Sequence, residues 1–175
     1  MTSQLIPPSE ALRGYFESSI VSTIFSAEKK QTEKLYHHGF WVSNIGFLLP
    51  QRYISEVSDQ TPVSRLPNTP NWLCGMTNLR GNIVPVFDFN ILLGIHSKQK
   101  NNRKQISVCI DDQWVAIYSD GLPTRVLVNH EDQMDKIPPI PDQLQPFVSR
   151  CYKQEEHIWL DWDIDGFFKW LANNM

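Results

Sequence analysis

The amino-acid sequence predicts a mainly β domain, folded as small barrels or a sandwich, behind a short helical extension. Three observations predict this class. Short β-rich runs are broken by turn residues, strands do not alternate with long helices, and 12 prolines mark connections between the runs. A chain of 175 residues suits one domain with an appendage and can bury a core of useful size.

The predicted extension comes first in the chain. Ser9 follows two prolines and can cap a helix with an apolar stripe formed by Leu12, Phe16 and Ile20. Such a stripe docks onto the main domain or onto a partner, because short helices need tertiary support. We therefore assign residues 1–36 to an N-terminal helical extension and residues 37–175 to the main domain.

Three β-hairpins are predicted in the main domain. GFWV and IGFLLP flank Ser43 and Asn44, QISVCI and WVAIYSD flank the turn at 111–113, and RCY and HIWLD flank the turn at 153–156. In each case two runs rich in β-forming residues enclose a few turn-forming residues.

Two short helices and one loop are predicted outside these hairpins. Asp88 can cap FNILL, which Gly94 would end, and Asp163 or Asp165 can cap GFFKWLANN. The polar run HSKQKNNRKQ, residues 96–105, predicts an exposed loop.

Composition bears on compartment and partners. Three widely spaced cysteines without a CxxC pair are typical of small core residues in a reducing compartment: Cys74, Cys109 and Cys151. The first residues do not resemble a secretion signal, and no apolar run is long enough to span a bilayer, so we expect a cytoplasmic protein. A net charge of -3 with scattered lysines and arginines argues against nucleic acid and anionic membranes as partners.

No motif for metal binding, cofactor binding or catalysis is complete. Residues 161–166, DWDIDG, match the first half of a calcium loop, but Ala172 stands where the loop requires a bidentate glutamate. The five histidines lack ligand spacing, and the sequence has no nucleophile elbow or glycine-rich phosphate loop. We expect no cofactor, no metal and no enzymatic activity.

The stretch MTNLRGNIVPVFD contains the most informative pattern. Two strands, Met76–Leu79 and Ile83–Phe87, are predicted around a tight turn in which Gly81 and Asn82 tolerate positive φ. The turn would project Arg80 outward. An arginine there either presents a rigid fork of donors to a partner or pairs with a local carboxylate, Asp88 or Glu56, as a brace.

The same stretch resembles CheW-like coupling proteins. The resemblance rests on a pattern of ten residues and extends over roughly residues 39–171: Trp72, Leu73, Gly75, Asn78, Leu79, Arg80, Gly81, Pro85, Val86 and Asp88. The family resemblance implies two small five-stranded SH3-like barrels packed on a shared core. It also implies a non-catalytic adaptor between the cytoplasmic tip of a transmembrane chemoreceptor and a CheA-type histidine kinase.

The resemblance further implies where partners bind. Arg80 matches the family arginine tied to receptor binding, and Ile54 and Glu56 match positions on the same groove, with Asn78 and Gly81 completing the receptor-binding set. The Trp-Leu start of the motif and the extension look most like the PilI branch, which serves twitching motility on type IV pili. We therefore expect recruitment to membrane receptor arrays, and we assign no kinase-contact residues.

Two departures from the family pattern and two alternative functions stay open. The polar turn in RCYKQEEHIWLD and the pair Leu122-Pro123 differ from the family pattern. The first alternative is a stand-alone regulatory barrel that captures a small anion through Arg80. The second, least favoured because helix capping explains the same residues, is an enzyme that uses Asp88, Asp161 or Asp163.

Overall fold

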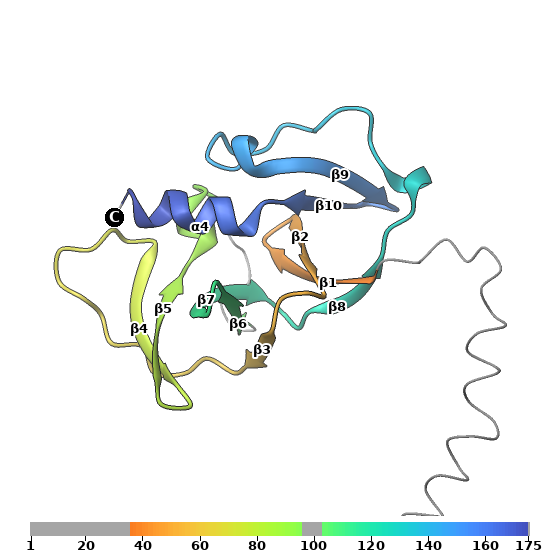
Figure 1. Ribbon diagram of the computed structural model, residues 1–175. Helices are drawn as coiled ribbons and strands as arrows, with labels where there is room; N and C mark the ends of the chain where they lie inside the picture. The colour runs from red at the N-terminus through yellow and green to blue at the C-terminus, as the bar shows by residue number, and fades with distance from the viewer. Residues whose placement is uncertain (1–35, 96–102, 175) are drawn as a thin grey trace, which may run out of the picture. The chain divides into compact units, whose positions relative to one another are not determined.

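The computed structural model describes residues 36–95 and 103–174 (Figure 1). The predicted N-terminal helices and most of the predicted loop at 96–105 lie outside these residues. The first described strand begins at Tyr36, one residue inside the range that we assigned to the extension.

The described residues form two five-stranded sheets, which we call barrel A and barrel B (Figure 1). Barrel A has the strand order β8-β1-β2-β10-β9 and barrel B the order β3-β6-β7-β5-β4. The strands of barrel A are β1 (Tyr36–Val42), β2 (Ile45–Pro50), β8 (Thr124–Leu127), β9 (Val148–Gln154) and β10 (His157–Trp162). Those of barrel B are β3 (Ser55–Ser58), β4 (Leu73–Leu79), β5 (Asn82–Phe87), β6 (Arg103–Ile110) and β7 (Gln113–Asp120).

All three predicted hairpins are present as antiparallel pairs: β1 with β2, β6 with β7, and β9 with β10. The turn between β6 and β7 is shorter than predicted, because Gln113 already pairs with Ile110. Asp111 and Asp112 take φ of 47° and 62°, which are the φ values of the type I′ turn that matches strand twist.

The two main helices also begin where the sequence predicted. Asp88 caps α3 (Phe89–Leu92) by accepting from the amide of Asn90 at 3.0 Å, and Gly94 follows with φ 65°. Asp163, rather than Asp165, caps α4 (Ile164–Ala172) by accepting from the amide of Gly166 at 3.0 Å. Two short 3-10 helices, η1 (His130–Asp132) and η2 (Gln145–Phe147), lie between β8 and β9.

Three apolar clusters fill the domain. Leu48, Val126, Tyr152 and Trp159 lie inside barrel A. Leu79, Val84, Val86 and Ala116 lie inside barrel B. The largest cluster joins residues of both sheets with Ile164, Phe167, Phe168 and Leu171 of α4. The domain therefore has two barrels packed on a shared core, as the resemblance implied, and α4 covers that core.

The two barrels repeat one topology in permuted order. Strands β3, β4, β5, β6 and β7 of barrel B occupy the places of β8, β9, β10, β1 and β2 in barrel A. Each barrel has one parallel pair, Val86 with Ala116 in barrel B and Trp159 with Gly46 in barrel A. Aligning these two pairs gives a residue-by-residue match between the barrels.

One edge of each barrel is closed by the segment that follows β3 in barrel B or β8 in barrel A. In barrel B, Ser64 and Met76 exchange both backbone hydrogen bonds, at 2.8 and 2.9 Å. In barrel A, Gln133 bridges to Tyr152, and the amide of Met134 donates to the carbonyl of Cys151 at 2.8 Å. These bridges pair edge groups that would otherwise be open.

All three cysteines are free thiols. Cys151 is buried in the shared core, whereas Cys74 and Cys109 are half-buried. Burial raises the pKa of the Cys151 thiol to about 11. The expectation of core cysteines is therefore met fully by Cys151 alone.

Candidate functional site

The hairpin of β4 and β5 places Arg80 at its tip. Leu79 pairs with Asn82, so the turn has two residues, Arg80 and Gly81, with φ of 50° and 93°. These are the φ values of a type I′ turn. The prediction that Gly81 and Asn82 take positive φ is therefore wrong for Asn82, which begins β5. The residue that takes the left-handed conformation beside Gly81 is Arg80 itself.

Asn78 stabilises the turn from the preceding strand. Its side-chain oxygen accepts a hydrogen bond from the amide of Gly81 at 2.7 Å. This contact holds the tip and leaves the arginine side chain in solvent, where 78% of it is exposed. Asn78 and Gly81 thus position Arg80 rather than extend its contact surface.

Glu56 of β3 is the acidic partner of Arg80. The guanidinium Nη2 and the carboxylate Oε1 are 3.0 Å apart, and 27% of the Glu56 side chain is exposed. Of the two carboxylates considered from sequence, Glu56 is the one that pairs with Arg80. An ion pair with one such exposed member contributes little to stability, so it orients the arginine more than it braces the core.

Apolar side chains lie exposed near this ion pair. Ile54 is 69% exposed, and its carbonyl accepts from the amide of Cys109 at 2.9 Å, which extends the β3–β6 ladder by one residue. Ile54 and Glu56 therefore stand two residues apart in an extended segment and share one face. Ile83, which pairs with Asn78 across the hairpin, is 66% exposed. The arrangement offers one charge and two apolar anchors.

Asp88 has a different partner, which the sequence did not indicate. Arg103 binds it through two hydrogen bonds, of 2.7 and 2.8 Å, and reaches Asp120 at 3.2 Å. Only 10% of the Arg103 side chain is exposed. The hydrogen bonds to Asp88 raise the pKa of Arg103 further, against the effect of burial. Residues 103–105, predicted as the end of an exposed loop, therefore begin strand β6.

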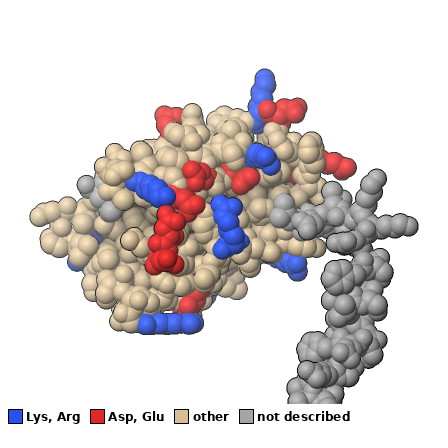
Figure 2. Space-filling view, in the orientation of Figure 1, with Lys and Arg blue, Asp and Glu red and all other residues tan. Residues whose placement is uncertain are grey.

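The face drawn in Figure 2 has acidic and basic side chains interspersed, without one large patch of either sign. Among residues 36–95 and 103–174, no group of three or more His, Cys, Asp and Glu is placed to hold a metal ion. In the same ranges, no helix has the length and apolar content needed to cross a bilayer.

Comparison with known proteins identifies the family. The family model described as CheW-like domain matches residues 39–172. The chain belongs to the CheW-like domain family. This confirms the resemblance drawn from the motif around Arg80, and the matched range covers both barrels and α4.

The individual relatives share about a quarter of their residues with this chain over the aligned regions. The chain is 27% identical over 154 residues to the chemotaxis protein CheW of Helicobacter pylori, covering 86% of this chain and 91% of that protein. It is 25% identical over 119 residues to the protein PilI of Pseudomonas aeruginosa, covering 67% of each. A PilI protein is thus among the relatives, alongside CheW proteins.

A solved structure shows the same fold. The scaffolding protein TtCheW from Thermoanaerobacter tengcongensis matches with a TM-score of 0.65 and 21% identity, over 78% of this chain and 93% of that chain. The CheW-like arrangement of two five-stranded barrels is therefore confirmed. The receptor-binding roles of Arg80, Glu56, Ile54, Asn78 and Gly81 stay predictions.

Proposed function

We propose that this chain is a non-catalytic adaptor that couples the cytoplasmic tip of a chemoreceptor to a CheA-type histidine kinase. Membership of a family of chemosensory scaffold proteins supports the general role. The receptor would contact the tip of the β4–β5 hairpin and the neighbouring β3 segment. This coupling requires no catalytic group.

The backbone of Arg80 is the observation that carries the proposal. At φ 50° a branched or long side chain is disfavoured, and type I′ turns prefer Asn, Asp or Gly at this position. Arginine is therefore a poor choice for folding the hairpin. A side chain that costs stability and stays exposed in solvent is explained by recognition of a partner.

The surroundings of Arg80 suit a receptor helix. Glu56 restrains the guanidinium, so less side-chain entropy is lost when it binds a carboxylate or a carbonyl group. Ile54, two residues before Glu56, and Ile83, three residues after Arg80, supply exposed apolar surface. A helix with an apolar stripe and an acidic residue would match both features.

The output of the pathway is the finer part of the proposal. We propose control of type IV pilus twitching motility, supported by the similarity to a PilI protein. The adaptor would be cytoplasmic and would join receptor arrays at the membrane through its partners rather than by insertion.

Capture of a small anion is less well supported by the same geometry. The guanidinium that would bind the anion already lies 3.0 Å from the Glu56 carboxylate, which repels a second negative charge. A helical partner can add apolar contacts to offset the loss of that ion pair, whereas a small anion cannot.

Binding to two purified partners tests the proposal. The full chain is titrated with a receptor cytoplasmic fragment and with the CheA-like kinase from the same cell, as wild type and as Arg80→Glu. Arg150→Glu, on an exposed position of β9, is the matched control. We expect Arg80→Glu to weaken receptor binding at least ~10-fold, because loss of a hot-spot arginine typically reduces the binding free energy by that amount. Kinase binding should be unchanged.

Two results would contradict the proposal. Wild-type protein that binds neither partner would leave the family fold without the coupling function. Equal loss of receptor binding in Arg80→Glu and Arg150→Glu would show a general charge effect rather than a site at the hairpin tip. A thermal unfolding scan of each variant checks that the fold is intact.

A further inference from the structure

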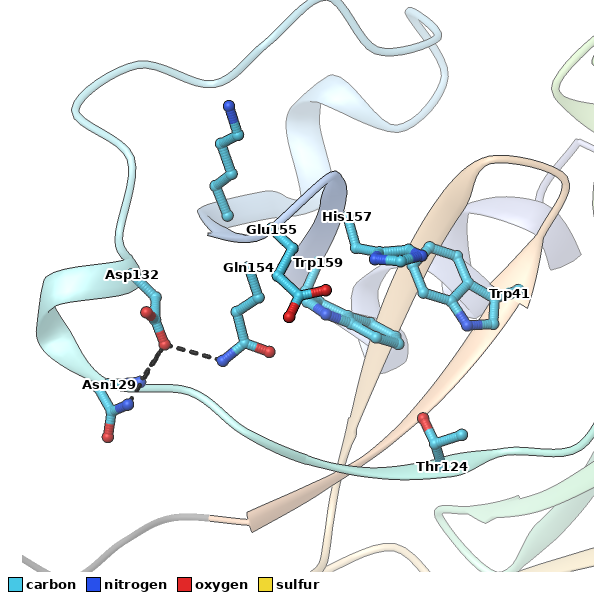
Figure 3. A pocket seen from close by; sticks show the side chains of 9 residues that line it. Trp41, Thr124, Asn129, Asp132, Gln154, Glu155, His157 and Trp159 are labelled. Atoms are coloured by element: carbon cyan, nitrogen blue, oxygen red, sulfur yellow. Dashed lines mark hydrogen bonds between the residues drawn. The ribbon is translucent and has the colours of Figure 1, made fainter.

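Barrel A contains an open cavity that lies outside the candidate receptor site. Its volume is about 650 Å³, which is within the range of small-ligand sites. Figure 3 shows one wall built from the rings of Trp41, His157 and Trp159. The ring centroids of Trp41 and Trp159 are 4.2 Å apart, and those of Trp41 and His157 are 5.0 Å apart.

The aromatic wall is not required by the fold. The match between the barrels places Trp41 opposite Gly46 where barrel B has Ser107 opposite Ala116. It places Trp159 where barrel B has Val86. Barrel B closes with these three small side chains, all of them buried. The indole rings of barrel A therefore add a feature that the shared topology does not need.

The opposite wall is polar and braced. Gln154 donates to the carbonyl of Leu127 at 2.6 Å and to the Asp132 carboxylate at 2.8 Å. The same carboxylate oxygen accepts from the amide of Asn129 at 3.0 Å (Figure 3). These contacts fix the wall before any ligand arrives, which lowers the entropic cost of binding.

Glu155 supplies a carboxylate that this network does not use. Among the described residues, no hydrogen bond or ion pair reaches its side chain. Figure 3 shows its carboxylate between Gln154 and the indole rings. Glu155 takes φ 54°, where Asn, Asp or Gly would suit the β9–β10 turn better. The long acidic side chain is thus retained in a position unfavourable for folding.

We propose that this cavity binds a guanidinium group. The planar cation would stack on the indole wall and pair with the Glu155 carboxylate through its fork of donors. The chain uses the stacking contact elsewhere, since Arg125 lies 3.6 Å from the centre of the Tyr36 ring. Lys153 also lines the cavity, but among the described residues no Arg or Lys lies over the ring of Trp41 or Trp159. The guanidinium would therefore come from outside this domain.

A titration of the full chain tests the proposal directly. The probe is N-acetyl-arginine methylamide, and its neutral isostere, the citrulline derivative, is the control. Chemical shifts of the tryptophan indole N–H groups are followed at pH 7.5 and low salt. We expect saturable shifts of the Trp41 and Trp159 signals with the arginine probe alone. Equal shifts with the citrulline probe, or no saturation, would overturn the proposal.

Variants locate the cation and separate binding from folding. Glu155→Gln should weaken the affinity for the arginine probe by ~3–10-fold, because one ion pair and its hydrogen bonds are lost. Glu156→Gln changes the neighbouring residue of the same turn, which does not line the cavity, and should change affinity less than ~2-fold. Similar losses in both variants would show general acidity and overturn the site.

Two further variants complete the design. Trp41→Ser installs the residue that barrel B has at the matched position and should also weaken the probe, because the stacking surface is removed. Glu155→Gly relieves the left-handed backbone, so it should keep or raise thermal stability while losing affinity. Full affinity in Glu155→Gly would overturn the proposal without any question of folding.

The source of the guanidinium is settled by a second pair of ligands. An Ala-Arg-Ala peptide, blocked at both ends, is compared with the single-residue probe N-acetyl-arginine methylamide. Tighter binding of the peptide identifies an arginine side chain of a partner protein, because the backbone then adds contacts with the braced wall. Tighter binding of the free derivative identifies a small guanidinium compound. Failure of both ligands to bind overturns the site.

Discussion

At the end of the β6–β7 hairpin away from its turn, barrel B has Arg103 opposite Asp120, whereas the matched end of the β1–β2 hairpin in barrel A has His37 opposite Pro50. We call these two matched places the corners of the barrels. Arg103 is paired with two carboxylates and stays charged. His37 has an Nδ1 atom that is buried without a hydrogen-bond partner among the described residues. The same position in one topology therefore has a paired charge in one barrel and a desolvated imidazole in the other.

The acidic residues at this corner differ in the same way. Asp88 both caps α3 and binds Arg103, so one carboxylate has two roles. In barrel A, Asp161 is the charged neighbour of His37, and Asp163, two residues later, caps α4. Separating the roles leaves the cap exposed to solvent. In barrel B the buried Asp88 performs both roles, the helix cap and the ion pair, so barrel B depends on the single arginine that neutralises it.

The barrel B corner also connects the two barrels. The amide of Ser43, in the turn between β1 and β2 of barrel A, donates to Asp120 at 2.6 Å. Asp120 in turn binds Arg103. The cluster therefore holds a barrel A turn against barrel B, and among residues 36–95 and 103–174 no hydrogen bond of this kind is present at the His37 corner.

Removal of Arg103 should have the largest effect on stability. Arg103→Met leaves the Asp88 carboxylate buried without the cation that binds it, so the free energy of unfolding should fall by about 3–5 kcal/mol. Denaturant unfolding followed by tryptophan fluorescence measures the change. Lys104→Met, which removes the neighbouring surface ion pair with Asp59, is the matched control and should stay near wild type. Equal effects of the two variants would contradict a special role of the corner.

The sequence revealed the turns more readily than this corner. Hairpins and helix caps depend on local residue preferences, so Ser43, Asp88 and Asp163 could be interpreted directly. Arg103 stands in a polar run, and its burial depends on Asp88 and Asp120, which are 15 and 17 residues away. Strand β3 was missed for a related reason, because its four residues, SEVS, alternate between exposed and half-buried positions and include one apolar side chain only, which does not resemble a core strand.

The candidate site was predictable in part. The motif identified Arg80 and its family, and Glu56 was one of two carboxylates considered. The left-handed backbone at Arg80 was assigned one residue too far along the chain, because arginine disfavours positive φ. The cavity wall was not predictable, since Trp41 and Trp159 meet only through pairing of β1, β2 and β10.

The second comparison between the barrels concerns packing around the parallel pairs. A Cβ added to Gly46 would lie 2.5 Å from Cε3 of Trp159 and 2.9 Å from the Ile158 carbonyl oxygen. Gly46→Ala should therefore cost about 1–3 kcal/mol through overpacking. The double variant Gly46→Ala with Trp159→Val installs the barrel B pair. Its cost should be smaller than the sum of the single costs by ~1 kcal/mol or more. Strict additivity would show that the two positions do not compensate each other.

The third prediction uses pH to distinguish the two corners. Burial lowers the pKa of His37. The negative charge of Asp161 opposes this by raising the pKa, and the neighbouring His38 lowers it slightly further. The unfolded chain therefore binds a proton more readily than the folded chain, and stability falls as pH drops through the unfolded pKa of about 6.5. Unfolding free energies at pH 7.5 and 5.5 measure this loss.

Variants assign that pH dependence. In His37→Gln the loss of stability between pH 7.5 and 5.5 should be smaller than in wild type, because one titrating group is gone. A His37→Gln slope identical to wild type would place the pH dependence elsewhere and leave the His37 corner without a titrating role.

The smallest expected effect on stability is at the tip of the β4–β5 hairpin. Here a variant of Arg80 is compared with a variant of the β6–β7 turn, to which we assign no binding role. Arg80→Asn gives the Asn-Gly pair preferred in type I′ turns, so the unfolding free energy should rise by about 0.5 kcal/mol, partly offset by loss of the Glu56 pair. The same variant should weaken the receptor fragment, whereas Asp111→Asn, in a turn with the same φ pattern, should leave binding unchanged. Gain of stability with loss of binding would show that Arg80 is kept at the tip for recognition. A loss of stability in Arg80→Asn would instead make its pair with Glu56 a brace of the fold.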